Sequence, residues 1–177
     1  MDIRTARLGG RPVNRGDLDY VVSMDTNWSV QKTLFGKLSG RVESQQRLER
    51  WVRIWETQGF GFWIFSNTRG EVIGHAGIFN SPREEGSIEV GYALKPAHWG
   101  KGYAMEMAMV SLDVAFVTFA LPRIIAIAAP ENIASRRVLE KCGMALDREF
   151  VSTQSLPSVR YSAARNDWIR WRSQASP

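Results

Sequence analysis

The sequence contains a single cysteine, Cys142, among its 177 residues, which excludes an internal disulfide. That scarcity agrees with a reducing compartment such as the cytoplasm. Cys142 falls in the last turn of a predicted helix, where we expect it to pack rather than to act as a nucleophile. We expect no metal site.

The chain also lacks a hydrophobic run long enough to cross a membrane. Its most apolar segment, residues 104–121, is interrupted by Glu106 and Asp113. No basic and then apolar leader begins the sequence, so nothing argues for export. We therefore expect a cytoplasmic protein without a membrane span.

The composition is that of an ordinary globular protein, with 44% hydrophobic and 23% charged residues. No internal repeat, low-complexity tract or linker interrupts it, so we expect one domain over residues 1–177. The net charge is +5, and part of it comes from Arg160, Arg165, Arg170 and Arg172. Trp168 and Trp171 lie among these arginines, which is a weak nucleic-acid pattern. A solvated terminal helix that buries both tryptophans is the favoured interpretation.

Apolar periodicity and turn signals predict strands alternating with helices. The expected strands cover residues 3–13, 60–66, 71–79, 84–94, 123–129, 146–153 and 159–163. The expected helices cover residues 17–24, 43–58, 104–119 and 132–143. Gly9 and Gly10 weaken the first strand and suggest a bulge. Asp17 suits the start of the first helix.

Two further features describe how these elements pack. Helix 43–58 and its flank carry apolar residues at helical spacing, a stripe that we expect to face the core: Val42, Leu48, Trp51, Val52 and Trp55. A strand, a helix and a strand follow one another over residues 84–129, which predicts a crossover unit and two parallel strands. The sequence thus predicts an α/β fold, a mixed sheet with helices on both faces.

A glycine loop is the most informative feature of the chain. The strand before it stops at Lys95 and Pro96, and Gly100 and Gly102 then lead directly into helix 104–119. A helix start of this kind exposes backbone N–H groups without intrahelical partners, at the positive end of the helix dipole. We expect it to bind an anion, and the natural anion is a phosphate group.

Three kinds of phosphate loop compete for this segment. A Walker loop needs Ser or Thr after Gly-Lys, but Gly102 follows Lys101. A dinucleotide fingerprint needs a third glycine where Met105 stands. The third kind is the pyrophosphate loop of the GNAT acetyltransferases, which this segment resembles with Trp99 in its first position, Gly102 as its glycine and Ala104 as its last small residue.

A second motif strengthens that resemblance. Asn132, Ser135, Lys141 and Gly143 are similar in type and spacing to the other acetyltransferase motif, Asn-x-x-Ser-x-x-x-x-x-Lys-x-Gly. Asn132 suits a helix N-cap and Gly143 the left-handed residue after a helix, which an ordinary capped helix would explain equally well. The order of the two motifs along the chain resembles the RimJ/RimL type of GNAT N-acetyltransferase. This resemblance implies the GNAT fold, a mostly antiparallel mixed sheet whose central parallel strands splay apart.

The resemblance implies acetyl-CoA as the cofactor. The backbone amides of Gly100, Lys101, Gly102, Tyr103 and Ala104 would hold its pyrophosphate, and Ala93 and Leu94 would pair with its pantetheine arm. Asn132 would contact the cofactor, and Lys101 and Arg136 are candidate partners of the 3′-phosphate.

Glu89 is the candidate general base, because a free amine is mostly protonated near neutral pH. Alternation places Glu89 and Gly91 on one face of their strand, so a merely solvent-facing glutamate is the other interpretation. Many relatives use a tyrosine as proton donor, but Leu139 stands there and we expect it to pack. Ser135 is the candidate donor or merely a cofactor contact. Tyr92 and His75 are further polar candidates.

We expect an N-acetyltransferase whose acceptor is a primary amine, preferably the α-amino group of a protein or peptide. A small amine, such as a polyamine or an antibiotic, is the alternative. A non-catalytic acyl-CoA-binding regulator and, more weakly, a nucleic-acid-binding module also remain open. Trp28, Leu34 and Phe35 are candidates for a cover over the acceptor. The sequence leaves the oligomeric state undetermined.

Overall fold

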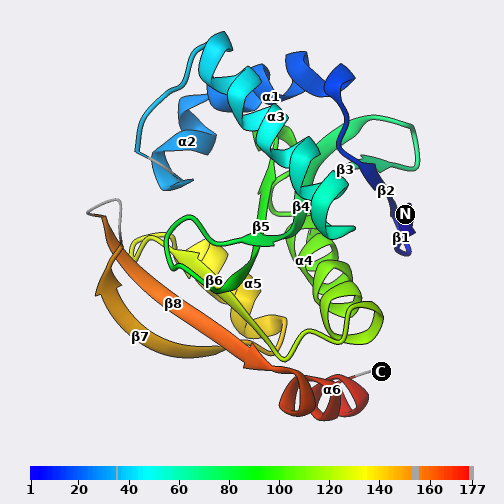
Figure 1. The fold of residues 1–177 in the computed structure, drawn as a ribbon, viewed down its shortest axis with the longest axis vertical. Coiled ribbons are helices and arrows are strands. Elements are labelled where there is room, and N and C mark those ends of the chain that lie inside the picture. Colours follow the sequence, from blue (N-terminus) through cyan, green and yellow to red (C-terminus); the bar gives the residue numbers. More distant parts are fainter. Residues whose placement is uncertain (35, 153–155, 176–177) are drawn as a thin grey trace.

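The computed structural model describes residues 1–34, 36–152 and 156–175. Within these residues, the strands form one eight-stranded sheet in the order β1-β2-β3-β4-β5-β6-β8-β7 (Figure 1). The strands are β1 (Ile3–Arg4), β2 (Leu8–Pro12), β3 (Phe62–Asn67), β4 (Val72–Asn80), β5 (Ile88–Leu94), β6 (Arg123–Ala128), β7 (Ala145–Val151) and β8 (Pro157–Ala164). The α-helices are α1 (Leu18–Asp25), α2 (Trp28–Leu34), α3 (Arg41–Gln58), α4 (Tyr103–Asp113), α5 (Ile133–Lys141) and α6 (Arg165–Gln174).

The central strands β5 and β6 are parallel, as the crossover predicts, and they separate. Their recorded register is the single pair Glu89 and Ile125, whereas β5 pairs with β4 and β6 pairs with β8 along their whole lengths. Among the described residues, the backbone of β5 beyond Glu89 therefore has no paired strand on its β6 side. The splayed parallel pair expected from the resemblance is confirmed.

Helices cover both faces of the sheet (Figure 1). On one face, Val90 of β5 packs with Leu112 of α4 and Leu139 of α5. On the other face, Leu48 and Val52 of α3 pack against β3. Strand alternation sends neighbouring β5 residues to opposite faces, so Ala93 packs with Met24 and Val30 of the α1–α2 side.

The N-terminal segment differs from the predicted single strand. It forms two short antiparallel strands, β1 and β2, because Thr5 and Leu8 close a turn: Thr5 N donates to Leu8 O at 2.9 Å and Leu8 N to Thr5 Oγ1 at 2.9 Å. Gly10 makes no bulge but pairs regularly with both neighbouring strands. A Cβ there would lie 2.9 Å from both Ile3 and Phe65, so close packing explains the glycine.

Other boundaries shift for local reasons. Asp17 is the N-cap residue of α1, as predicted, but its side chain makes no cap hydrogen bond to that helix. Its carboxylate instead accepts from Asn14 N at 2.8 Å, in a capping box with Asn14 around the short 3-10 helix Arg15–Asp17. Strand β5 begins at Ile88 rather than at residue 84, because residues 81–87 form a loop. Val42 is 68% exposed and does not belong to the core stripe.

The predicted helix over residues 104–119 is divided into two parts. Helix α4 begins at Tyr103 and ends at Asp113, and a π-helix, Val114–Thr118, continues from it. Strand β7 ends at Val151, and Thr153, the predicted end, lies outside the described residues.

Candidate active site

The glycine loop adopts the conformation that an anion site requires. Gly100 and Gly102 have φ angles of 73° and 79°, the left-handed region that glycine occupies without a steric penalty. Gly102 is the N-cap of α4, and in the described part of the chain no side-chain cap hydrogen bond is made at this helix start. Its first-turn N–H groups are therefore available to a ligand.

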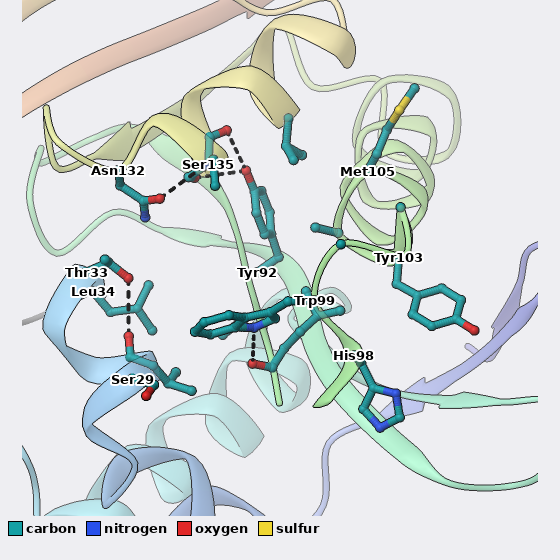
Figure 2. Close-up of a pocket in the computed structure, with 18 of the residues that line it drawn as sticks. Ser29, Thr33, Leu34, Tyr92, His98, Trp99, Tyr103, Met105, Asn132 and Ser135 are labelled. Atoms are coloured by element: carbon teal, nitrogen blue, oxygen red, sulfur yellow. Dashed lines mark hydrogen bonds between the residues drawn. The ribbon is translucent and has the colours of Figure 1, made fainter. Parts of the chain in front are cut away.

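A cavity of about 550 Å³ lies beside this loop (Figure 2). Its walls come from the carboxyl end of β5, the loop and first turn of α4, the start of α5 and one side of α2. The volume lies in the range of small-molecule sites. Tyr92, Ala93, Leu94, Trp99, Gly100, Gly102, Tyr103, Ala104, Asn132 and Ser135 are among the lining residues.

The second motif forms a capped helix, as predicted. The Asn132 side chain accepts from Ser135 N at 3.1 Å, which ties both motif residues to the start of α5. Gly143 follows the helix with a φ of 78°, and a Cβ there would lie 2.4 Å from the Trp171 ring. Asn132 and Ser135 both face the cavity (Figure 2).

Tyr92 and Ser135 meet on the cavity wall. The Tyr92 hydroxyl lies 3.0 Å from Ser135 Oγ and donates to the Ser135 carbonyl at 3.0 Å. Burial raises the pKa of Tyr92 above its ordinary value, so its hydroxyl stays protonated at neutral pH. Leu139 is buried in the core beneath them, as predicted for a packing residue.

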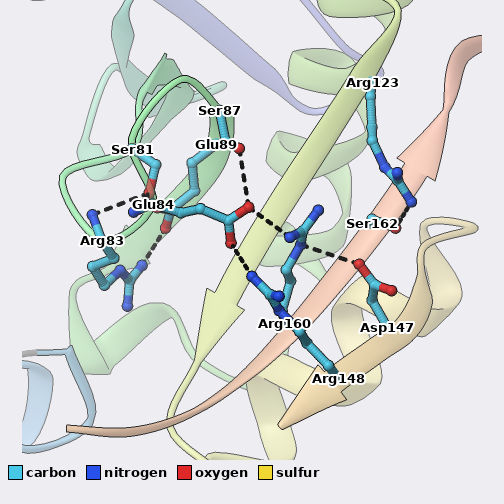
Figure 3. A network of polar contacts seen from close by, with 10 residues as sticks. All are labelled: Ser81, Arg83, Glu84, Ser87, Glu89, Arg123, Asp147, Arg148, Arg160 and Ser162. Carbon is cyan, nitrogen blue, oxygen red and sulfur yellow. Dashed lines mark hydrogen bonds and ion pairs between the residues drawn. The ribbon is translucent and has the colours of Figure 1, made fainter. Parts of the chain in front are cut away.

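Glu89 lies on the other face of β5, buried to 1% exposure, so it is not a solvent-facing glutamate. One carboxylate oxygen pairs with the Arg83 guanidinium, and the other accepts from Ser81 Oγ at 2.6 Å (Figure 3). Burial raises the pKa of Glu89, while Arg83 and Ser81 oppose the rise. Glu89 is not among the cavity-lining residues.

The loop of residues 81–87 is fastened at two points. Arg83 joins it to Glu89 on β5, and Glu84 joins it to Arg148 of β7 at 3.2 Å and to Arg160 of β8 at 2.5 Å. Arg160 also pairs with Asp147 at 3.1 Å. Figure 3 shows this network running from the loop across β6 to β7 and β8.

Comparison with known proteins decides the family. Residues 7–145 match the family described as an acetyltransferase (GNAT) domain. The chain belongs to the GNAT acetyltransferase family. It is an N-acetyltransferase, and the family uses acetyl-CoA as acetyl donor.

Individual proteins agree with this assignment. The FsC-acetyl coenzyme A-N(2)-transacetylase of Aspergillus fumigatus is 29% identical over 185 residues, covering 95% of this chain and 78% of that protein. The crystal structure of an Agrobacterium tumefaciens acetyltransferase has a TM-score of 0.82 and 26% identity, covering 92% of this chain and 94% of that one. The ribosomal-protein-S5-alanine acetyltransferase of Vibrio fischeri has a TM-score of 0.75 and covers 95% of this chain and 98% of its own, but its 19% identity supports the fold alone.

Two candidate 3′-phosphate partners of this GNAT enzyme do not line the cavity and bond to other groups of the protein. Lys101 Nζ donates to Ala97 O at 2.9 Å, and the Arg136 guanidinium donates to Tyr161 Oη at 3.2 Å and to Pro130 O at 3.0 Å. Lys141, by contrast, lines the cavity. Lys141 is the lysine of the second motif, and its position in that motif could have identified it as a cavity residue.

Two other residues considered from the sequence, His75 and Cys142, are buried and do not line the cavity. His75 is buried among Tyr20, Trp51 and Phe62, and burial lowers its pKa to about 3, so it is neutral at pH 7. Burial raises the pKa of Cys142 to about 12, so it remains a packed thiol. Within the described ranges, no group of three or more acidic, histidine or cysteine residues could hold a metal.

The three residues predicted to cover the acceptor lie in different places. Leu34 lines the cavity, Trp28 is exposed and Phe35 lies outside the described residues. Trp168 is buried and Trp171 packs on Gly143, which agrees with a terminal helix that covers its tryptophans. In the described part of the chain, no helix combines the length and apolar character needed to cross a bilayer.

Proposed function

We propose that this GNAT enzyme transfers the acetyl group of acetyl-CoA to an α-amino group of a protein or peptide. The observation that carries the cofactor site is the uncapped start of α4, which opens into the cavity beside the unpaired end of β5. The amides of residues 100–104 would bind the pyrophosphate, and Ala93 and Leu94 would pair with the pantetheine arm as an added strand. Trp99, Asn132 and Ser135 would contact the rest of the cofactor.

The bound cofactor supplies an activated acetyl thioester, and the chain's own groups manage the protons. Glu89 would take the proton of the acceptor amine, either directly or through a water molecule. Both of its oxygens are engaged by Arg83 and Ser81. Each oxygen has a further lone pair, which could accept the proton of the amine or of a bridging water.

Ser135 would give a proton to the leaving sulfur. Its hydroxyl faces the cavity and lies within hydrogen-bond distance of Tyr92, whose raised pKa preserves it as a donor. Tyr92 can thus orient the Ser135 hydroxyl, and the proton that Ser135 gives up would be replaced from solvent after the products leave. Ser135 and Tyr92 would together replace the proton-donating tyrosine that many relatives have at the position of Leu139.

The charges around Glu89 favour an α-amine over a polyamine. Three neighbouring carboxylates, those of Glu84, Glu89 and Asp147, already pair with arginines. A polyamine needs several unpaired carboxylates, whereas an α-amine, with a pKa near 8, needs only modest assistance from a base.

Competition between acceptors tests the proposal. Purified protein would receive acetyl-CoA together with N-terminal peptides, spermidine and an aminoglycoside at equal concentrations, and mass spectrometry would locate the products. We expect acetyl groups on peptide α-amines. Efficient acetylation of the small amines with peptides untouched would refute the α-amino acceptor, and failure of calorimetry to detect CoA binding would refute the cofactor site.

A further inference from the structure

The turn between β1 and β2 contacts the first turn of α4, 99 residues further along the chain. The Glu106 carboxylate of α4 accepts from Arg7 N at 2.9 Å, from Arg7 Nε at 2.7 Å and from the Thr5 hydroxyl. Burial alone would raise the pKa of Glu106, but these donors outweigh burial and lower it. The carboxylate is therefore a charged anchor for the turn.

The Arg7 side chain reaches beyond Glu106 to the glycine loop itself. Its NH1 group donates to the Lys101 carbonyl at 3.0 Å, and its Cζ lies 4.6 Å from the centre of the Tyr103 ring. A single guanidinium thus contacts the residues on both sides of Gly102. Because a guanidinium is planar and forked, it can satisfy these partners together, which an ammonium group cannot do.

The bond to Lys101 determines which way a loop amide points. The peptide that joins Lys101 to Gly102 is planar, so its N–H points away from its C=O. Arg7 holds that carbonyl from outside the cavity, and Gly102 lines the cavity. The Gly102 N–H is therefore turned towards the space where an anion would bind.

Arg7 also balances a charge. Glu106 lies in the first turn of α4, and a bare carboxylate there would repel a phosphate at the same helix terminus. The ion pair between Arg7 NH2 and Glu106 Oε2, 2.6 Å long, offsets that repulsion. Arg7 thus acts on both the shape and the potential of the loop.

We infer that Arg7 is a positioning residue that keeps the loop of residues 100–104 in the conformation that binds the cofactor pyrophosphate. The inference rests on the cofactor site proposed above. A loop that spends only about a tenth of its time in the competent conformation binds its ligand about tenfold more weakly. Arg7→Gln should therefore weaken CoA binding about tenfold.

Calorimetry with CoA and NMR titration with pantetheine, which lacks the pyrophosphate, would test the inference. We expect Arg7→Gln to lose CoA affinity and keep pantetheine affinity. Arg7→Lys should retain most of the defect, because a lysine can pair with Glu106 but cannot also reach the Lys101 carbonyl in the same geometry. Arg15→Gln, which breaks the exposed Arg15–Glu56 pair, is the matched control and should leave both affinities unchanged.

Hydrogen exchange of the free protein gives a second, ligand-independent measurement. The amide of Glu106, which donates to Gly102 O at 3.2 Å, should exchange faster in Arg7→Gln, while those of α5 stay unchanged. Equal CoA affinity of Arg7→Gln and wild type, or an equal loss of CoA and pantetheine affinity, would overturn the inference. If the wild type itself fails to bind CoA, the cofactor site falls, and unchanged exchange would separately overturn the role of Arg7.

Discussion

The two sides of the splayed strands present different chemical groups. The proposed cofactor side consists of residues 99–105 and 132–135 and offers backbone N–H groups, glycines and one helix cap. The proposed acceptor side consists of the loop of residues 81–87 with β7 and β8, and it offers arginine–carboxylate pairs. Backbone recognition suits a cofactor common to a whole family, whereas side-chain pairs can change with the acceptor.

The largest effect should come from Glu89 on the acceptor side. We expect Glu89→Gln to fold and to bind acetyl-CoA but to lose about 10²–10⁴-fold in turnover, as general bases do. The deficit should shrink at high pH, because the acceptor amine then loses its proton unaided. Steady-state rates across a pH series measure this.

Retained acetyl-CoA affinity is the control that separates the two sides, because Glu89 does not line the cofactor cavity. A wild-type rate at neutral pH would mean that the carboxylate serves only to hold Arg83. The acceptor side would then need another base.

Arg83→Gln should cost stability in a pH-dependent way. Burial raises the pKa of Glu89 and Arg83 opposes the rise, so removing Arg83 should raise the pKa further. A raised pKa stabilises the fold below the ordinary value near 4.3 and loses that contribution as the pH rises. We expect little destabilisation at pH 4 and about 2–3 kcal/mol at pH 7, measured by urea unfolding.

Arg148→Gln provides the comparison for Arg83→Gln. It breaks a more exposed pair with Glu84 in the same network, so it should cost less than about 1 kcal/mol at either pH. A constant penalty for Arg83→Gln across the pH series would mean that Glu89 titration is not its cause.

The two sides also differ in how well their sequences predict them. Gly100, Gly102 and Asn132 have roles set by local backbone geometry, which restricts those positions to few residue types, so the loop and the capped helix could be predicted. The partners of Glu89 and Glu84 could not be predicted, because arginines occur throughout the chain and only tertiary structure selects among them. For the same reason the sequence did not indicate the contact of Arg7 with Glu106.

On the cofactor side, Gly102→Val should weaken CoA binding about tenfold or more. A valine at a φ of 79° is strained, and its Cβ would lie 3.4 Å from Arg7 NH2, so it would disturb the loop and the contact that holds it. Losing one or two charge-assisted hydrogen bonds to the pyrophosphate is sufficient for that change. Gly70→Val is the matched control, since Gly70 has a φ of 78° and open space around it. Both variants should lose stability, but only Gly102→Val should lose CoA affinity in calorimetry. Equal affinities would exclude this loop as the pyrophosphate site.

The smallest effect should come from Ser135, which lies on the cofactor side next to Tyr92. Ser135→Ala preserves the helix cap, because Asn132 accepts from the backbone N–H of Ser135 rather than from its hydroxyl. We expect turnover to fall about tenfold, at or below the low end of acid–base effects, because the Tyr92 hydroxyl can share the role. CoA affinity should change less than turnover, and Tyr92→Phe combined with Ser135→Ala should lower turnover further. A loss of CoA affinity with full turnover at saturating acetyl-CoA would make Ser135 a cofactor contact alone and leave proton donation to Tyr92 or solvent.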